Sequence, residues 1–122
     1  MNVDTATTQD IFKAVFEHAP IGIYTIATDG TIDSFNPKMV EMAGAQNASE
    51  VIGLNVFQMD TYKLAGLDTF FRSGLHGEPF ETETRYISKT GNKETWRHYR
   101  GVPLRSENGT TIERLLLLVS DI

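Results

Sequence analysis

The chain contains no cysteine among its 122 residues. A disulfide, a thiolate metal ligand and a thiol nucleophile are therefore all excluded. The absence is consistent with a reducing compartment, and we expect the chain to be cytoplasmic.

Long apolar runs are also missing. The longest, Leu115 to Val119, has the length of a buried strand, whereas crossing a bilayer takes about 20 apolar residues. The N-terminal stretch Met1 to Asp10 lacks the basic start and apolar centre of a signal peptide. We expect no membrane contact by this segment.

Basic residues are few and scattered. The chain has 11 Lys and Arg against 16 Asp and Glu, a net charge of −5. We expect no nucleic-acid binding, because phosphate contacts need a basic face. No Gly-x-Ser-x-Gly elbow or phosphate-cradling glycine loop occurs. We therefore expect no enzymatic activity, and any catalysis would reside in a domain outside this chain.

What is present suffices for one folded domain. Apolar residues make up 40% of the chain, enough for a single core over residues 8–122, with residues 1–7 as a flexible tail. Residues 8–19 are predicted to be helical because four apolar residues recur at helical spacing before Pro20 ends the helix. These residues are Ile11, Phe12, Val15 and Phe16.

The remaining pattern alternates strands with short helices. Two short strands flank Asp29-Gly30, which predicts a type I′ turn. A segment of short helices follows, with its longest helix over 62–75. Three further strands complete the chain, with a turn at Lys89–Asn92. The predicted strands cover residues 21–28, 31–36, 80–88, 94–105 and 112–122.

This order predicts an α+β fold with one antiparallel sheet and helices packed on its face. The last strand is so rich in leucine that we expect it to be central in the sheet, next to the first strand.

Several short motifs follow one another in the chain. They are Thr28-Asp29-Gly30-Thr31-Ile32 with Asn36, then Met42-Ala43-Gly44, Val51-Ile52-Gly53, Lys89-Thr90-Gly91 with Trp96, and Ser120-Asp121-Ile122. In this order and spacing they resemble the PAS family, the sensor modules of signal-transduction proteins, over roughly residues 10–122.

The resemblance implies a five-stranded antiparallel sheet in the order 2-1-5-4-3. Short helices would cover one face and enclose a ligand cavity, and residues 8–19 would form an N-terminal helix beside a PAS core of residues 20–122. The domain would be the input module of a larger histidine kinase or regulator. It would sense a small molecule and signal through its last strand and Asp121 to a covalently linked effector domain.

Two residues at which cofactor-binding members of the family have a cysteine or a histidine limit which cofactors this chain could bind. The light-oxygen-voltage subgroup bonds flavin through a cysteine, and Val56 occupies that position in Gly53-Leu54-Asn55-Val56. Covalent flavin is thereby excluded. Haem-binding relatives place a histidine where Leu67 stands. We predict no cofactor, neither haem nor non-covalent flavin. We also predict no metal, since the histidines are dispersed, although His76 is an alternative haem ligand.

The fourth strand supplies the main candidates for ligand binding. The resemblance implies an alternation along this strand that, counted from Trp96, would turn Arg97 and Tyr99 toward the cavity, where an arginine would bind a carboxylate or phosphate. Two alternatives remain open, an internal ion pair with an acid of the covering helices and a one-residue slip that turns Arg97 outward. The further predicted ligand-binding residues are Asn36, Met59, Phe70, Thr84 and Tyr86, with Tyr24 and Met42 as additional cavity candidates.

The apolar stripe of the first helix needs cover from water. We expect this stripe, Ile11, Phe12, Val15 and Phe16, to dock near Trp96 on the outer face of the sheet, either of the same chain or of a partner. We therefore predict a homodimer through the N-terminal helix. The alternative to a ligand-gated sensor is a ligand-free module whose filled core serves only dimerisation or protein interaction.

Overall fold

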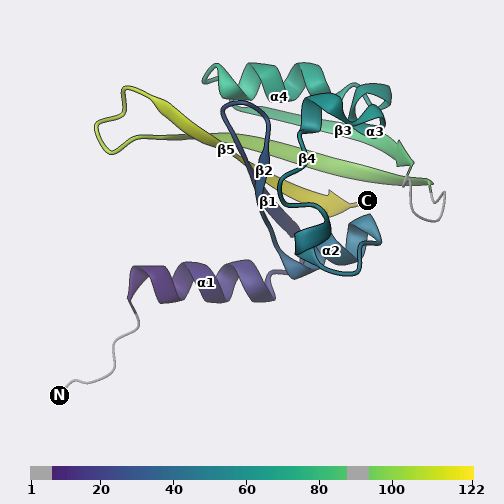
Figure 1. Cartoon of the computed structure of the whole chain (residues 1–122), viewed down its shortest axis with the longest axis horizontal. Coiled ribbons are helices and arrows are strands. Elements are labelled where there is room, and N and C mark those ends of the chain that lie inside the picture. The colour runs from purple at the N-terminus through teal and green to yellow at the C-terminus, as the bar shows by residue number, and fades with distance from the viewer. Residues whose placement is uncertain (1–6, 88–93) are drawn as a thin grey trace.

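The computed structural model describes residues 7–87 and 94–122, so the predicted turn at Lys89–Asn92 and most of the predicted tail lie outside the described residues. One five-stranded antiparallel sheet has the order β2-β1-β5-β4-β3, as predicted. The short helices gather over one face, and the N-terminal helix lies apart from them (Figure 1). The elements are α1 (Thr8–His18), β1 (Gly22–Ala27), β2 (Ile32–Phe35), α2 (Pro37–Ala43), η1 (Ala48–Glu50), η2 (Val56–Gln58), α3 (Asp60–Leu64), α4 (Leu67–Leu75), β3 (Phe80–Ile87), β4 (Glu94–Arg105) and β5 (Ile112–Asp121).

The last strand is central, as its composition predicted. β5 pairs with β1 on one side and with β4 on the other. Leu115, Leu117 and Val119 are fully buried under the helices. Leu116 and Leu118, on the opposite face, are only half-buried. The outer face of the sheet is therefore apolar but incompletely covered.

The hairpin between β1 and β2 differs from the predicted type I′ turn. Ala27 N donates to Thr31 O at 2.8 Å and Gly30 N donates to Ala27 O at 2.9 Å, which encloses a three-residue loop. Gly30 supplies the positive φ, 93°, that such loops require. Thr31 N also donates to the Asp29 carboxylate, and this bond stabilises the longer loop.

The predicted long helix over residues 62–75 is wrong. Two helices, α3 and α4, take its place because Gly66 adopts the left-handed conformation with φ 76°. Leu64, at the end of α3, is 87% exposed. Leu67 and Phe71 are buried, so the apolar stripe begins only after the break.

The N-terminal helix has the predicted extent to within one residue. Asp10 N donates to Thr7 Oγ1 and Thr7 N donates to the Asp10 carboxylate, each at 3.1 Å, which makes a capping box. These bonds hold the pKa of Asp10 below its ordinary value. None of the residues of α1 is buried, so the helix is tethered mainly at its C-terminal end.

That tether is the side chain of Asn36, which is fully buried at the start of α2. Its Oδ1 accepts from Ile23 N and Met39 N, both at 2.9 Å. Its Nδ2 donates to Phe16 O at 3.0 Å and to Ile21 O at 3.1 Å. One amide therefore joins the end of α1, the start of β1 and the first turn of α2.

Replacing this amide tests whether it holds the three elements together. Asn36→Ala removes a helix cap and leaves buried backbone groups without partners, so we expect the free energy of unfolding to fall by about 2–4 kcal/mol. Urea titration followed by circular dichroism measures the change. Asn47→Ala is the control, because Asn47 precedes η1 without a capping bond. An equal effect of both changes would contradict this reading.

Candidate functional site: a cavity under the short helices

A cavity of about 210 Å³ lies between the short helices and the inner face of the sheet. Its walls come from elements far apart in the chain, including β2, β4 and the helical segment between them. The lining residues are Phe35, Met39, Ala43, Ala45, Glu50, Val51, Leu54, Met59, Thr61, Tyr62 and Arg97.

Arg97 reaches this cavity from β4 and is only 2% exposed. Its Nη2 donates to Met42 O at 2.8 Å, and its Nη1 lies 3.5 Å from the Tyr99 hydroxyl. Tyr99, two residues further along the strand, is fully buried. Trp96, which precedes Arg97, faces outward and is 55% exposed. The predicted alternation is thus confirmed, and the alternative of a one-residue slip is ruled out.

Tyr62 also lines this cavity and is paired with a second buried tyrosine. Tyr24 from β1 donates to the hydroxyl of Tyr62 from α3 at 3.2 Å, and both rings are buried. Tyr62 was not among the cavity residues predicted from the sequence. A residue facing the sheet from a short helix cannot be placed while the helix boundaries are uncertain, and here the break at Gly66 changes which residues of the segment face inward.

Some of the other predicted ligand-binding residues line the cavity and others do not. Met59 lines the cavity. Thr84 holds the helical layer to the sheet, since its Oγ1 donates to Ala65 O at 2.9 Å. Phe70 is on the outer side of α4, with its ring centroid 5.3 Å from that of Phe80. Asn36 directs its bonds to backbone groups, and the side chain of Tyr86 lies outside the described residues.

The two positions that bear on cofactors are in the core. Val56 in η2 and Leu67 at the start of α4 are both fully buried and belong to the same apolar cluster. Neither side chain offers a nucleophile or a metal ligand. Within the described residues no group of three or more His, Asp and Glu could hold a metal ion.

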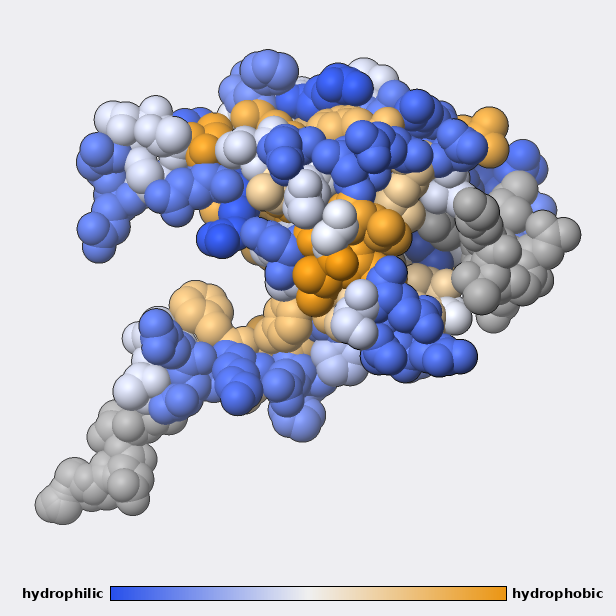
Figure 2. Space-filling view, viewed as in Figure 1, coloured by the Kyte–Doolittle hydropathy of each residue, from blue (hydrophilic) through white to orange (hydrophobic). Residues whose placement is uncertain are grey.

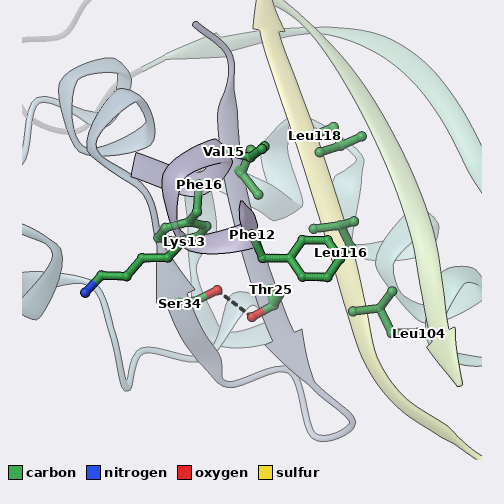
Figure 3. A pocket seen from close by; sticks show the side chains of 10 residues that line it. Phe12, Lys13, Val15, Phe16, Thr25, Ser34, Leu104, Leu116 and Leu118 are labelled. Carbon is green, nitrogen blue, oxygen red and sulfur yellow. Dashed lines mark hydrogen bonds between the residues drawn. The ribbon is translucent and has the colours of Figure 1, made fainter. Parts of the chain in front are cut away.

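A second concavity separates α1 from the outer face of the sheet, and Figure 2 shows it as an open cleft above the helix. This groove, about 620 Å³, is almost entirely apolar. Phe12, 69% exposed, is directed toward Leu116 in Figure 3. The residues lining it are Phe12, Lys13, Val15, Phe16, Ile23, Thr25, Ser34, Leu104, Leu116 and Leu118.

The predicted interface residues do not all meet at this groove. Phe12, Val15 and Phe16 line it, whereas Ile11 and Trp96 are exposed without lining it. The outer face of β3 and β4 carries polar contacts instead. The Glu81 carboxylate lies 2.8 Å from His98 Nε2 and 3.2 Å from Arg100 Nη2, and these hydrogen bonds hold its pKa below the ordinary value.

The C-terminal end of β5 lies beside the cavity arginine. Asp121 is exposed and is paired with Arg97 in the antiparallel register. Ile122 N donates to Trp96 O at 3.0 Å, so the pairing continues to the last residue. No helix among the described residues has the length and apolar character needed to span a membrane.

Comparison with known proteins agrees with this architecture. The family model described as PAS fold matches residues 10–122. The PAS domain of an HTR-like protein from Haloarcula marismortui is 23% identical with a TM-score of 0.71, covering 94% of this chain and 92% of that one. A PAS domain from Colwellia psychrerythraea is 18% identical with a TM-score of 0.79, covering 95% and 98%.

A domain of a sensory box sensor histidine kinase/response regulator from Geobacter sulfurreducens is 19% identical with a TM-score of 0.75, covering 93% of each chain. No curated protein matches the chain. At these identities the solved structures show a shared fold and nothing of the ligand. With the family model matching nearly the whole chain and the sheet in the order β2-β1-β5-β4-β3, the chain belongs to the PAS family.

Proposed function

We propose that this domain is the sensory input module of a larger signalling protein and that its inner cavity binds a small organic anion. The observation that carries the proposal is the buried guanidinium of Arg97 in the wall of that cavity. The parent protein would be a cytoplasmic histidine kinase or transcriptional regulator, with the effector domain linked beyond β5.

Arginine suits this role for two physical reasons. Its charge persists at any physiological pH, and its planar fork donates two parallel hydrogen bonds to a carboxylate. Burying such a charge is unfavourable unless anionic or polar groups compensate it. Met42 O and the Tyr99 hydroxyl orient the guanidinium in the cavity wall, and a ligand carboxylate there would contribute further charge-assisted hydrogen bonds.

The size of the cavity favours a small ligand over a cofactor. At about 210 Å³ it is below the roughly 300–1,000 Å³ of pockets for drug-sized molecules. Flavin and haem need more space than this cavity offers. The side chains of Val56 and Leu67 support the same proposal, since they provide no attachment for either group.

A route for the signal follows from the pairing of β4 with β5. Arg97 and Asp121 are register partners at the end of the sheet where β5 would continue toward an effector. A ligand that shifts the guanidinium would therefore change the surroundings of the exit point. We assign Asp121 to signal output on this basis.

Two substitutions test the inner cavity. Ala43→Leu would place a larger side chain in the cavity wall, and Arg97→Met would remove the charge at similar length. We expect either to abolish binding of a small anion while changing the free energy of unfolding by less than about 2 kcal/mol. Native mass spectrometry of the purified protein detects a retained ligand, and calorimetric titration with short carboxylates measures affinity.

Arg100→Met is the matched control, because Arg100 is on the same strand but points outward to Glu81. It should leave binding unchanged. If Arg97→Met and Ala43→Leu bound the same carboxylates as the unaltered chain, the cavity would not be the ligand site.

We also propose that the domain is a homodimer in which the apolar groove beside α1 is filled by a second copy. Phe12 and Val15 are more than half exposed on one side of that groove, and Leu116 and Leu118 line the other. A monomer would leave this apolar surface in water, which is unusual for a soluble domain. An outward-facing groove larger than the inner cavity also favours the alternative function, a protein-interaction module without a ligand.

The groove can be made polar to test the dimer. Phe12→Ser with Val15→Ser removes apolar burial from both copies, so we expect dimer affinity to fall by at least about a hundredfold. Sedimentation velocity over a concentration series measures it. Leu64→Ser, at an exposed leucine of α3, serves as the control and should leave the dimer intact. A monomeric unaltered chain at all concentrations would refute the proposal.

A further inference from the structure

The charges around the inner cavity are arranged unevenly. Among its described lining residues, Arg97 and Glu50 alone are charged. Arg97 is at the buried end, 2% exposed. Glu50 is exposed at the end of η1, where its carboxylate accepts from Gln46 N at 3.2 Å. A ligand would therefore meet a positive charge inside and a negative charge at the solvent side.

The space between these two charges is small and mostly apolar. A volume of about 210 Å³ is below the roughly 300–1,000 Å³ of pockets for drug-sized molecules. That space admits a carboxylate with a short hydrocarbon tail and little more. The side walls that such a tail would contact are Phe35, Met39, Val51, Leu54 and Met59.

We propose that the ligand is a short monocarboxylate with an apolar tail and that Glu50 excludes doubly charged anions. The carboxylate binds Arg97, and the tail extends along the apolar wall toward the opening. A second carboxylate at the far end of the ligand would face Glu50, and like charges at close range are unfavourable. The site thus discriminates by repulsion as well as by attraction. This inference rests on the proposed binding of an organic anion at Arg97.

Calorimetric titration with three molecules of similar size tests the inference on the unaltered chain. Isovalerate has one carboxylate and a branched tail, 3-methylbutanamide replaces that carboxylate with a neutral amide, and succinate adds a second carboxylate. We expect isovalerate to bind at least about tenfold more tightly than the amide, because a charged hydrogen-bonded pair is lost. We expect a similar preference over succinate.

Glu50→Gln then isolates the repulsive element. The change keeps the shape of the side chain and the acceptor for Gln46 N, so the fold should be retained. We expect succinate affinity to rise by at least about threefold, with isovalerate nearly unchanged. Glu107→Gln, at an exposed turn distant in sequence from η1, is the control and should alter neither affinity.

The outcomes separate the two proposals. If none of the three molecules binds, or if the amide binds as tightly as isovalerate, anion binding at Arg97 fails and this inference fails with it. If succinate binds as tightly as isovalerate to the unaltered chain, only the selectivity assigned to Glu50 is overturned. That selectivity is likewise overturned if Glu50→Gln leaves the ratio of succinate affinity to isovalerate affinity unchanged.

Discussion

The fold depends on a single buried amide more than on any other polar group described. Asn36 connects three segments that the hydrophobic effect alone would leave loosely arranged, because apolar packing is non-directional. Its hydrogen bonds fix where α1 leaves the sheet and where α2 begins. The outer groove and the inner cavity are the spaces on either side of this junction. One of the cavity walls, Met39, is the residue whose backbone the amide caps.

The second constraint is the buried charge of Arg97. In a core otherwise built from leucine, isoleucine and aromatic rings, a guanidinium is the side chain that packing alone would not select. Sequences under selection for stability alone tend to avoid such groups, whereas binding sites retain them. The proposed ligand binding therefore depends on this arginine more than on any of the apolar cavity residues.

The sheet was predictable to a large extent and the helical layer much less so. The apolar β5 had to be central, and the alternation along β4 placed Arg97 and Tyr99 inward because a strand has a fixed period of two. The short helices have no such strong periodicity. Gly66 separates α3 from α4. The sequence pattern alone does not distinguish such a break from a glycine inside a continuous helix. Tyr62 was therefore not predicted to line the cavity, and Phe70 was predicted to bind a ligand although it lies on the outer side of α4. Glu50 was not predicted because a single turn such as η1 has no helical periodicity.

The origin of the cavity walls determines which substitutions the domain can tolerate. Apart from Arg97 and Phe35, the residues that line the cavity come from the segment between β2 and α4, where short helices such as α2, η1 and α3 alternate with loops. The bonds that define the frame are made at Asn36 and along the strands. Substitutions in these short helices and loops can therefore alter what the cavity accepts while the sheet and its junction persist. The domain can therefore acquire a different cavity lining without acquiring a new fold.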